Sequence, residues 1–266
     1  MTYENLQLRR DDHVAVVTLD RADKLNALSE GLSRDLLAAM DELRADDDVR
    51  VVVITGAGRG FCSGADLTDP ALRRERSEQS QSERLDEMGW VGRQALAVAR
   101  LDKPTIAAVN GVAAGAGMSL ALACDLRVGG SAARFRTVFA ERGLSPDSGM
   151  SYFLTRIVGY ARACDLIFTS RDVDAAEAYR LGLLDRLVDD ADPVGAAVEL
   201  GHQISALPPM AIRSGKRVLQ HNLEVDLDAA LRYEIAGLSY ARRAPNDARE
   251  AGLSFRERRP ATYTGT

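Results

Sequence analysis

The sequence predicts an α/β protein, with a core of alternating strands and helices and a helical C-terminal part. Up to about residue 150, short apolar runs rich in β-branched residues alternate with helical patterns. Beyond that point the strand signal nearly vanishes and helix-like segments dominate. The chain has 266 residues, 46% hydrophobic and 27% charged, so it can bury a sizeable core, and a disordered or fibrous protein is excluded.

The predicted strands are apolar runs bounded by charged or turn residues. They cover residues 14–19 (VAVVTL), 49–55 (VRVVVIT), 105–109 and 124–128, with one more short strand at 184–188. Ser29 is a favourable N-cap residue, and leucines and Met40 recur after it at helical spacing. We therefore expect the first long helix to begin there.

Residues 69–87 are polar and highly charged, and we expect a mobile loop that leads into a helix ending near residue 100. A loop at 111–117 precedes a short helix of small residues (MSLALA). The later helices are expected at 154–168, 174–181, 193–207, 209–221, 225–242 and 246–258. We divide the chain into a core, residues 1–200, and a C-terminal helical region, residues 201–266.

Charge and cysteine content exclude several classes of protein. The formal net charge is −5, which gives no global attraction for nucleic acid or an anionic membrane. The three cysteines form no CxxC pair, which argues against a disulfide framework or a zinc site. The N-terminus lacks a signal-peptide pattern, and the uncharged stretch 104–124 is too poor in bulky apolar residues to span a membrane. We expect a cytoplasmic protein.

Two segments resemble functional motifs but lack residues that those motifs require. The glycine turn in ITGAGRG follows a strand as a dinucleotide-binding turn would, but Cys62 replaces its last glycine, and no lysine has a tyrosine four residues before it. Ser119 lacks the G-x-S-x-G elbow of a hydrolase and has no histidine near it in sequence. Neither nicotinamide binding nor serine hydrolysis is expected.

Two runs of small residues carry a stronger signal. Residues 58–67 (GRGFCSGADL) and 110–117 (NGVAAGAG) each follow a buried strand and open toward a helix. Small residues let a ligand approach the main chain, whose free N–H groups can stabilise a developing negative charge. Two such turns that face one point would form an oxyanion hole.

Further motifs stand in order along the chain around the first of these runs. RADKLNAL precedes RGFCSGADL, and KPTIAAVNGVAAGAG, CDLRV and the C-terminal FRERRP follow it. This series resembles that of the crotonase (enoyl-CoA hydratase/isomerase) superfamily over nearly the whole chain. It implies a spiral of ββα turns and a helical trimerisation region, hence a homotrimer or a dimer of trimers. It also implies an acyl-CoA thioester as substrate, as in fatty-acid metabolism, with coenzyme A part of that substrate and no separate cofactor or metal.

The resemblance also assigns residues. The N–H groups of Ala65 and Ala116 would form the oxyanion hole over the thioester carbonyl. The residues implied along the CoA and pantetheine path are Lys24, Leu25, Ser63, Asp66 and Leu67. Phe255 and Arg258 match positions that reach CoA, often from a neighbouring subunit.

The departures from the family pattern bear on the chemistry. Hydratases of this family use two glutamates, and the corresponding positions here are Ser119 and Phe139. Hydration needs a general base for water and a proton donor for the α-carbon. Neither expected carboxylate is present, so ordinary hydration is not favoured.

A third position is occupied by an acid. The segment GLSPDSG places Asp147 where related isomerases carry a catalytic aspartate, and where a dehalogenase branch carries a nucleophile. An isomerase can work with one carboxylate, so we expect double-bond isomerisation with Asp147 as proton shuttle. The alternatives are an atypical hydratase that uses Asp147 or Glu141, a non-catalytic acyl-CoA-binding protein, and nucleophilic attack by Asp147. From the pattern alone, Pro-Asp-Ser-Gly could also be a simple turn.

Overall fold

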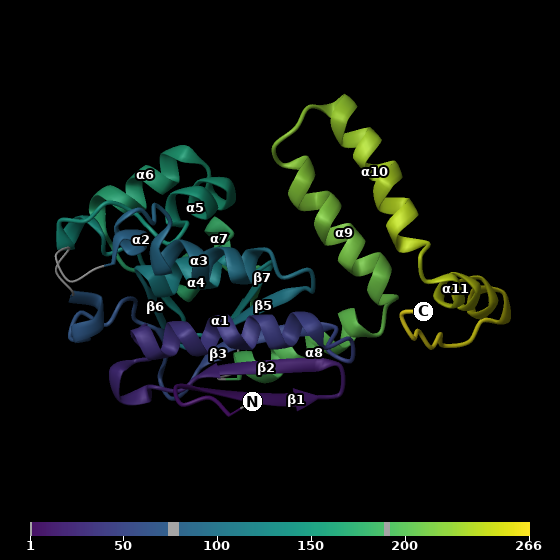
Figure 1. The fold of residues 1–266 in the computed structure, drawn as a ribbon, viewed down its shortest axis with the longest axis horizontal. Coiled ribbons are helices and arrows are strands. Elements are labelled where there is room, and N and C mark those ends of the chain that lie inside the picture. The colour runs from purple at the N-terminus through teal and green to yellow at the C-terminus, as the bar shows by residue number, and fades with distance from the viewer. Residues whose placement is uncertain (1, 74–79, 189–191) are drawn as a thin grey trace.

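The computed structural model describes residues 2–73, 80–188 and 192–266 (Figure 1). Its main sheet has six strands in the order β1-β2-β3-β5-β7-β10. The strands are β1 (Leu6–Asp11), β2 (Val14–Leu19), β3 (Val51–Gly56), β5 (Thr105–Val109), β7 (Leu126–Gly129) and β10 (Arg186–Leu187). All neighbouring strands are parallel except β1, which pairs antiparallel with β2 at the edge. The predicted strands are confirmed. The edge strand β1 was not predicted, because exposed polar side chains interrupt its apolar pattern.

The strand residues alternate between two apolar cores. On β3, Val52 and Ile54 belong to the larger core, whereas Val51 and Val53 face the smaller one. This period of two is the geometry of a strand covered on both faces. The larger core is completed by α1 (Glu30–Ala45), α3 (Gly89–Ala99) and α4 (Ala116–Ala123), and the smaller one by α8 (Pro193–Ser205).

The first long helix begins where the sequence predicted. The Ser29 side chain accepts a hydrogen bond from the Leu32 N–H at 3.1 Å, which is a standard N-cap. The predicted loop at 69–87 lies partly outside the described residues, at 74–79. Its described part contains the 3-10 turn η2 (Pro70–Arg73) and the short helix α2 (Gln81–Arg84).

A smaller four-stranded sheet lies beside the main one, in the order β4-β6-β8-β9. Its strands are β4 (Gly60–Cys62), β6 (Val112–Ala114), β8 (Arg134–Arg136) and β9 (Val173–Asp174). The prediction of an uninterrupted loop at 111–117 is therefore wrong, because β6 pairs with both β4 and β8. Strands of three residues or fewer are too short to show periodicity, so this sheet gave no sequence signal.

The helices after the second sheet include one correction. The single helix predicted at 154–168 is two helices, α5 (Met150–Val158) and α6 (Tyr160–Thr169). Gly159 separates them with φ 81° and ψ 160°, a conformation that interrupts the helix and that glycine adopts readily. The helix α7 (Ala175–Leu181) follows, close to its predicted position.

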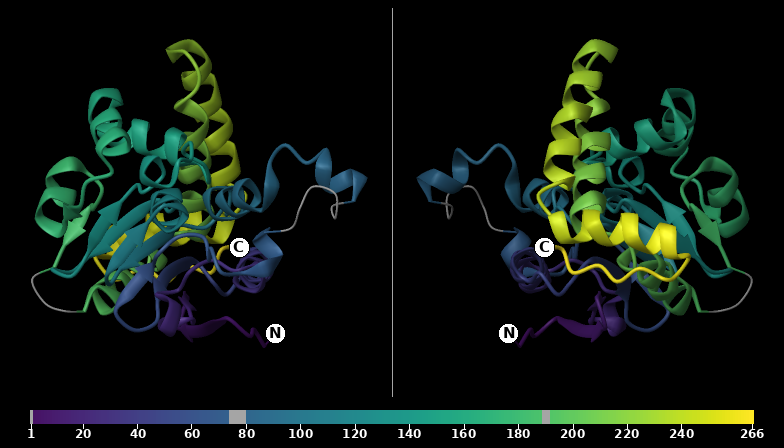
Figure 2. Two further views of the ribbon diagram at one scale, coloured as in Figure 1. Left: turned by 90° about the vertical axis from the view of Figure 1, so that its left-hand side faces the viewer. Right: turned by 90° about the vertical axis from the view of Figure 1, so that its right-hand side faces the viewer.

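The C-terminal helices extend away from the sheets. The helices α9 (Pro209–Asn222) and α10 (Leu227–Ala241) form an antiparallel pair, and α11 (Pro245–Glu257) lies at the end of the pair where α9 begins and α10 ends (Figures 1 and 2). Lys216 on α9 anchors the pair: its Nζ lies 2.6 Å from Asp125 Oδ2 and donates to the Lys103 carbonyl at 2.9 Å. Among the described residues, no helix is long and apolar enough to cross a membrane.

Candidate active site

The small sheet brings the two runs of small residues together. Strands β4 and β6 are parallel, with Gly60 opposite Val112 and Cys62 opposite Ala113. Because parallel strands end at the same edge of a sheet, the residues that follow each strand emerge side by side. The segment 63–67 follows β4, and Gly115 and α4 follow β6. The sheet thus places both predicted turns at one edge.

The N–H of Ala65 is turned away from its neighbouring strand. In the bridge between Leu28 and Ala65, the Leu28 N–H donates to the Gly64 carbonyl and the Leu28 carbonyl accepts from the Asp66 N–H. These bonds use the groups on either side of Ala65 and leave its own N–H facing the other way. Within the described residues, no backbone acceptor takes this N–H. It is available to a ligand.

The N–H of Ala116 is free for a different reason. Ala116 is the first residue of α4, and N–H groups in the first turn of a helix have no intrahelical acceptor. Gly115 precedes it with φ 50°, which directs the chain from β6 into the helix. The turn is tightly packed, since a Cβ on Gly117 would lie 2.1 Å from the Cys62 carbonyl oxygen. The helix dipole adds positive potential at this end.

The two turns are in direct contact. A Cβ on Gly64, whose φ is +99°, would lie 2.9 Å from the Ala114 carbonyl oxygen and 3.6 Å from the Ala116 nitrogen. Only glycine permits this close approach at this backbone angle. The structure therefore brings together the turns that carry Ala65 and Ala116, and two free N–H groups on such turns can stabilise one oxyanion.

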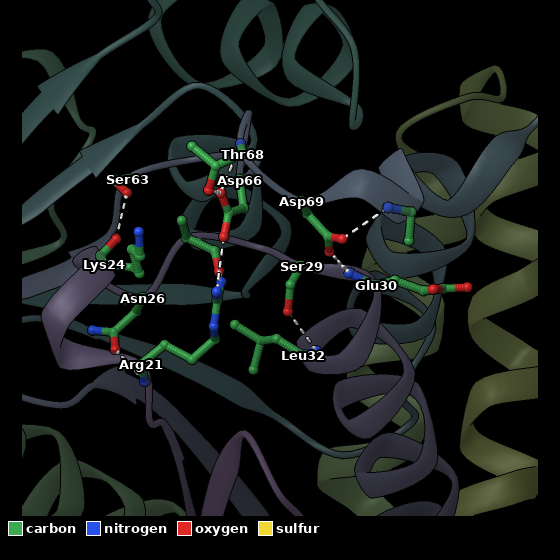
Figure 3. A network of polar contacts seen from close by, with 12 residues as sticks. Arg21, Lys24, Asn26, Ser29, Glu30, Leu32, Ser63, Asp66, Thr68 and Asp69 are labelled. Carbon is green, nitrogen blue, oxygen red and sulfur yellow. Dashed lines mark hydrogen bonds and ion pairs between the residues drawn. The ribbon is translucent and has the colours of Figure 1, made fainter. Parts of the chain in front are cut away.

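The chain around Arg21 supports the first turn (Figure 3). Ser63 donates from its N–H to the Leu25 carbonyl at 3.0 Å and from Oγ to the Lys24 carbonyl at 3.2 Å. Lys24 is exposed and ends the 3-10 turn η1 (Ala22–Lys24), and Leu25 follows with φ 49°. Leu67 is half exposed. These predicted CoA-path residues gather beside the turn that carries Ala65.

The Asp66 carboxylate is occupied within the protein. It is buried, pairs with Arg21 at 2.7 Å, and accepts from the Thr68 Oγ1 at 2.6 Å and the Thr68 N–H at 2.9 Å (Figure 3). The hydrogen bonds from Thr68 and Arg21 outweigh desolvation and lower the pKa of Asp66 to about 2. Its side chain fixes the turn that carries Ala65, a function that sequence reasoning missed because Arg21 lies 45 residues away.

The two positions that the family resemblance matches to the hydratase glutamates hold a small polar and an apolar side chain. Phe139 is buried in the larger core. Ser119 is fully buried on α4, and its Oγ lies 3.3 Å from the Gly115 carbonyl oxygen and 3.4 Å from the Asp147 carbonyl oxygen. Ser119 is three residues from Ala116, about 4.5 Å along the helix axis. The Asp147 carbonyl therefore contacts a side chain of the first turn of α4.

The two candidate acids have different surroundings. Asp147 is solvent-exposed as a residue, and partial desolvation of its carboxyl raises the pKa, while a hydrogen bond from Ser148 lowers it. Glu141 lies on the 3-10 turn η4 (Ala140–Arg142) and accepts from Arg136 at 2.6 Å in a surface ion pair. Of the two carboxylates, Asp147 has no cationic partner in the described part of the chain.

Phe255 and Arg258 lie apart from the oxyanion turns of the same chain. They belong to the end of α11, at the opposite side of the molecule from β6 (Figure 1). Phe255 is 85% exposed. With neighbouring residues they border an open cavity of about 690 Å³, lined also by Ala251, Ser254, Arg256, Arg259 and Tyr263. Within one chain, this cavity lies apart from the turns that carry Ala65 and Ala116.

Comparison with known proteins gives a consistent result. The family model described as enoyl-CoA hydratase/isomerase matches residues 9–266. The short-chain-enoyl-CoA hydratase of Clostridium acetobutylicum is 33% identical over 97% of both chains. The crystal structure of an enoyl-CoA hydratase from Bacillus anthracis superimposes with a TM-score of 0.90 at 30% identity, covering 99% of this chain and 100% of that one. The enoyl-CoA hydratase EchA1 from Mycobacterium marinum superimposes with a TM-score of 0.86 at 32% identity, over 98% and 99% of the two chains.

Proposed function

The chain belongs to the enoyl-CoA hydratase/isomerase family, and we propose that this crotonase-fold enzyme isomerises the double bond of an enoyl-CoA, with Asp147 as proton shuttle. The observation that carries the proposal is that, of three positions where family members carry catalytic acids, only one holds an acid in this chain. Ser119 and Phe139 occupy the positions of the hydratase glutamates, and Asp147 lies against the helix that starts with Ala116.

The reaction needs one proton acceptor and one oxyanion hole. The Asp147 carboxylate removes a proton from the α-carbon of a β,γ-unsaturated thioester. The electron pair shifts toward the carbonyl oxygen, where the Ala65 and Ala116 N–H groups stabilise the enolate. Asp147 then returns the proton to the γ-carbon, and the double bond moves to the α,β position. One carboxyl group performs both transfers, and a raised pKa suits it to them.

An atypical hydratase is the second candidate, because the similar proteins above are named hydratases. Hydration requires a base that activates water and an acid that protonates the α-carbon. Asp147 could supply one of these functions. Glu141 would have to leave its ion pair with Arg136 to supply the other.

The test offers the purified enzyme a β,γ-unsaturated enoyl-CoA and, separately, its α,β-unsaturated isomer. We expect isomerisation of the first, loss of at least about 100-fold in Asp147→Asn, and little change in the matched control Glu141→Gln. Rapid water addition to the α,β-isomer that persists in Asp147→Asn would refute the proposal in favour of hydration.

Two further results would also reject it. Binding without hydrogen exchange at the α-carbon in D₂O would indicate a non-catalytic acyl-CoA-binding protein. A covalent acyl-enzyme on Asp147, detected by mass spectrometry, would indicate nucleophilic attack.

The oligomer is part of the proposal. Large apolar side chains are exposed on and around α9 and α10, among them Leu219, Leu223, Leu227, Leu231 and Ile235. Such a patch supports burial against another copy of the chain. We propose a homotrimer or a dimer of trimers, in which Phe255 and Arg258 reach the CoA bound by a neighbouring copy. Light scattering of the purified protein tests this, and a monomer at micromolar concentration would contradict it.

A further inference from the structure

The Asp147 turn has an unusual backbone. The Asp147 carbonyl accepts from the Met150 N–H at 2.8 Å, and the two residues between them have positive φ, 53° at Ser148 and 81° at Gly149. Two positive φ angles in such a turn correspond to type I′, which favours Asn-Gly or Gly-Gly. Serine in the left-handed region is unfavourable, and its presence there points to a use for the side chain.

That side chain contacts the proposed proton shuttle. Ser148 is buried, and its Oγ donates to Asp147 Oδ1 at 2.9 Å. A hydroxyl that holds one carboxylate oxygen restricts rotation of the carboxyl group. No hydrogen bond within the described part of the chain engages Asp147 Oδ2. One oxygen is therefore held and the other is available to substrate.

A second serine holds the same residue by its main chain. The Ser119 Oγ lies 3.4 Å from the Asp147 carbonyl oxygen and 3.3 Å from that of Gly115. Because Gly115 immediately precedes Ala116, Ser119 links the acid turn to the start of the oxyanion helix. Movement of one relative to the other is restrained at this point.

The charged groups on the surrounding elements are Glu141 and Arg142 on η4 and Arg156 on α5, and none of them contributes to the Asp147 pKa. Helix α4 has no ionisable side chain. On the turn before Asp147, Glu141 pairs with Arg136, and on α5, Arg156 stacks on Tyr152 and approaches Glu224. Burial and Ser148 are thus the influences on the Asp147 pKa, acting in opposite directions.

We propose that Ser148 is a positioning residue, which orients the Asp147 carboxyl so that Oδ2 meets the substrate. This rests on the proposed function of Asp147. Ser148 does not contact the reacting atoms in this scheme. Its hydroxyl sets the direction of the carboxyl and favours the ionised form.

The experiment uses Ser148→Gly, because glycine tolerates positive φ and removes the hydroxyl together with its Cβ. We expect this variant to fold as well as the wild type, to keep KM, and to lose about 10- to 100-fold in kcat, the size expected for a misoriented catalytic group. Ser148→Ala, which keeps the backbone strain, should show the same kinetic loss and a lower Tm. Ser145→Gly, on the same segment and exposed, is the matched control and should retain full activity.

A second readout does not depend on activity. The carboxyl carbon of Asp147 is titrated by NMR in the free enzyme, and Asp147→Asn identifies its resonance. Loss of the Ser148 donor should raise the Asp147 pKa, and the acidic limb of the rate profile should move to higher pH. Unchanged kcat together with an unchanged Asp147 pKa in Ser148→Gly would overturn the inference. A pKa rise in an enzyme whose activity survives Asp147→Asn would instead reject the proposed function and uphold the contact.

Discussion

Gly64→Ala tests whether the two oxyanion turns need their close contact. The new Cβ would lie 2.9 Å from the Ala114 carbonyl oxygen, on a residue with φ +99°. A carbonyl of the main chain cannot rotate out of the way as a flexible side chain can. One of the two turns must therefore shift, and the N–H of Ala65, the next residue, shifts with it.

We expect the substitution to lower stability by about 1–2 kcal/mol or more through backbone strain. Loss of one oxyanion donor typically costs about 10²–10³ in kcat. The loss in turnover should thus far exceed what partial unfolding explains. The assay compares kcat for the enoyl-CoA substrate with the thermal unfolding midpoint of the same preparation.

Gly182→Ala is the matched control. Gly182 has φ +82° at the end of α7, and its Cβ would have no neighbour closer than 3.9 Å. It therefore introduces a similar strain outside the two turns, and we expect lower stability with unchanged kcat. Wild-type kcat in Gly64→Ala, or an equal loss in both variants, would refute this account of the site.

Three other outcomes are expected. The folded-state pKa of Asp66 is depressed to about 2, so its ionised form stabilises the fold at pH values above the unfolded pKa. Up to about 2 kcal/mol of unfolding free energy should therefore be lost as pH falls from 4 toward 2. Asp66→Asn should flatten this pH dependence in urea titrations. Lys216→Met leaves Asp125 without its ion-pair partner, at a cost of about 2–3 kcal/mol, and should increase amide exchange in α9. Lys216→Met combined with Asp125→Asn should recover part of this stability, because the amide removes the unpaired charge and its oxygen still accepts from Thr105. Ser29→Ala should cost about 1 kcal/mol in thermal unfolding and Ser29→Asp almost nothing.

The sequence was most informative where the structure is local. The strand at 14–19 and the N-cap at Ser29 were predicted correctly, because a buried strand and a helix start depend on neighbouring residues. The break at Gly159 was missed, since a single glycine inside an apolar helical pattern is often tolerated. The smaller sheet was missed because its strands depend on pairing between distant segments.

Some parts of the candidate site could likewise be predicted from the sequence, and others could not. The two glycine-rich turns could be found from their motifs, and their contact at Gly64 follows from the parallel pairing of β4 with β6. The pairing of Arg21 with Asp66 could not be found, because no sequence rule links residues so far apart. Ser148 gave a weak signal, since a serine before glycine is common in turns, and only its positive φ distinguishes it.

Two features of the site beside the start of α4 favour the same reaction. With no ionisable side chain on the helix and with Phe139 at a glutamate position, little competes with the Ala65 and Ala116 N–H groups for a developing negative charge. Desolvation of the Asp147 carboxyl raises its pKa, so that this group can both accept and return a proton. Isomerisation returns the proton that it removes, so one acid suffices. Hydration must move two different protons, and this arrangement offers no second unpaired acid beside α4 in the described part of the chain.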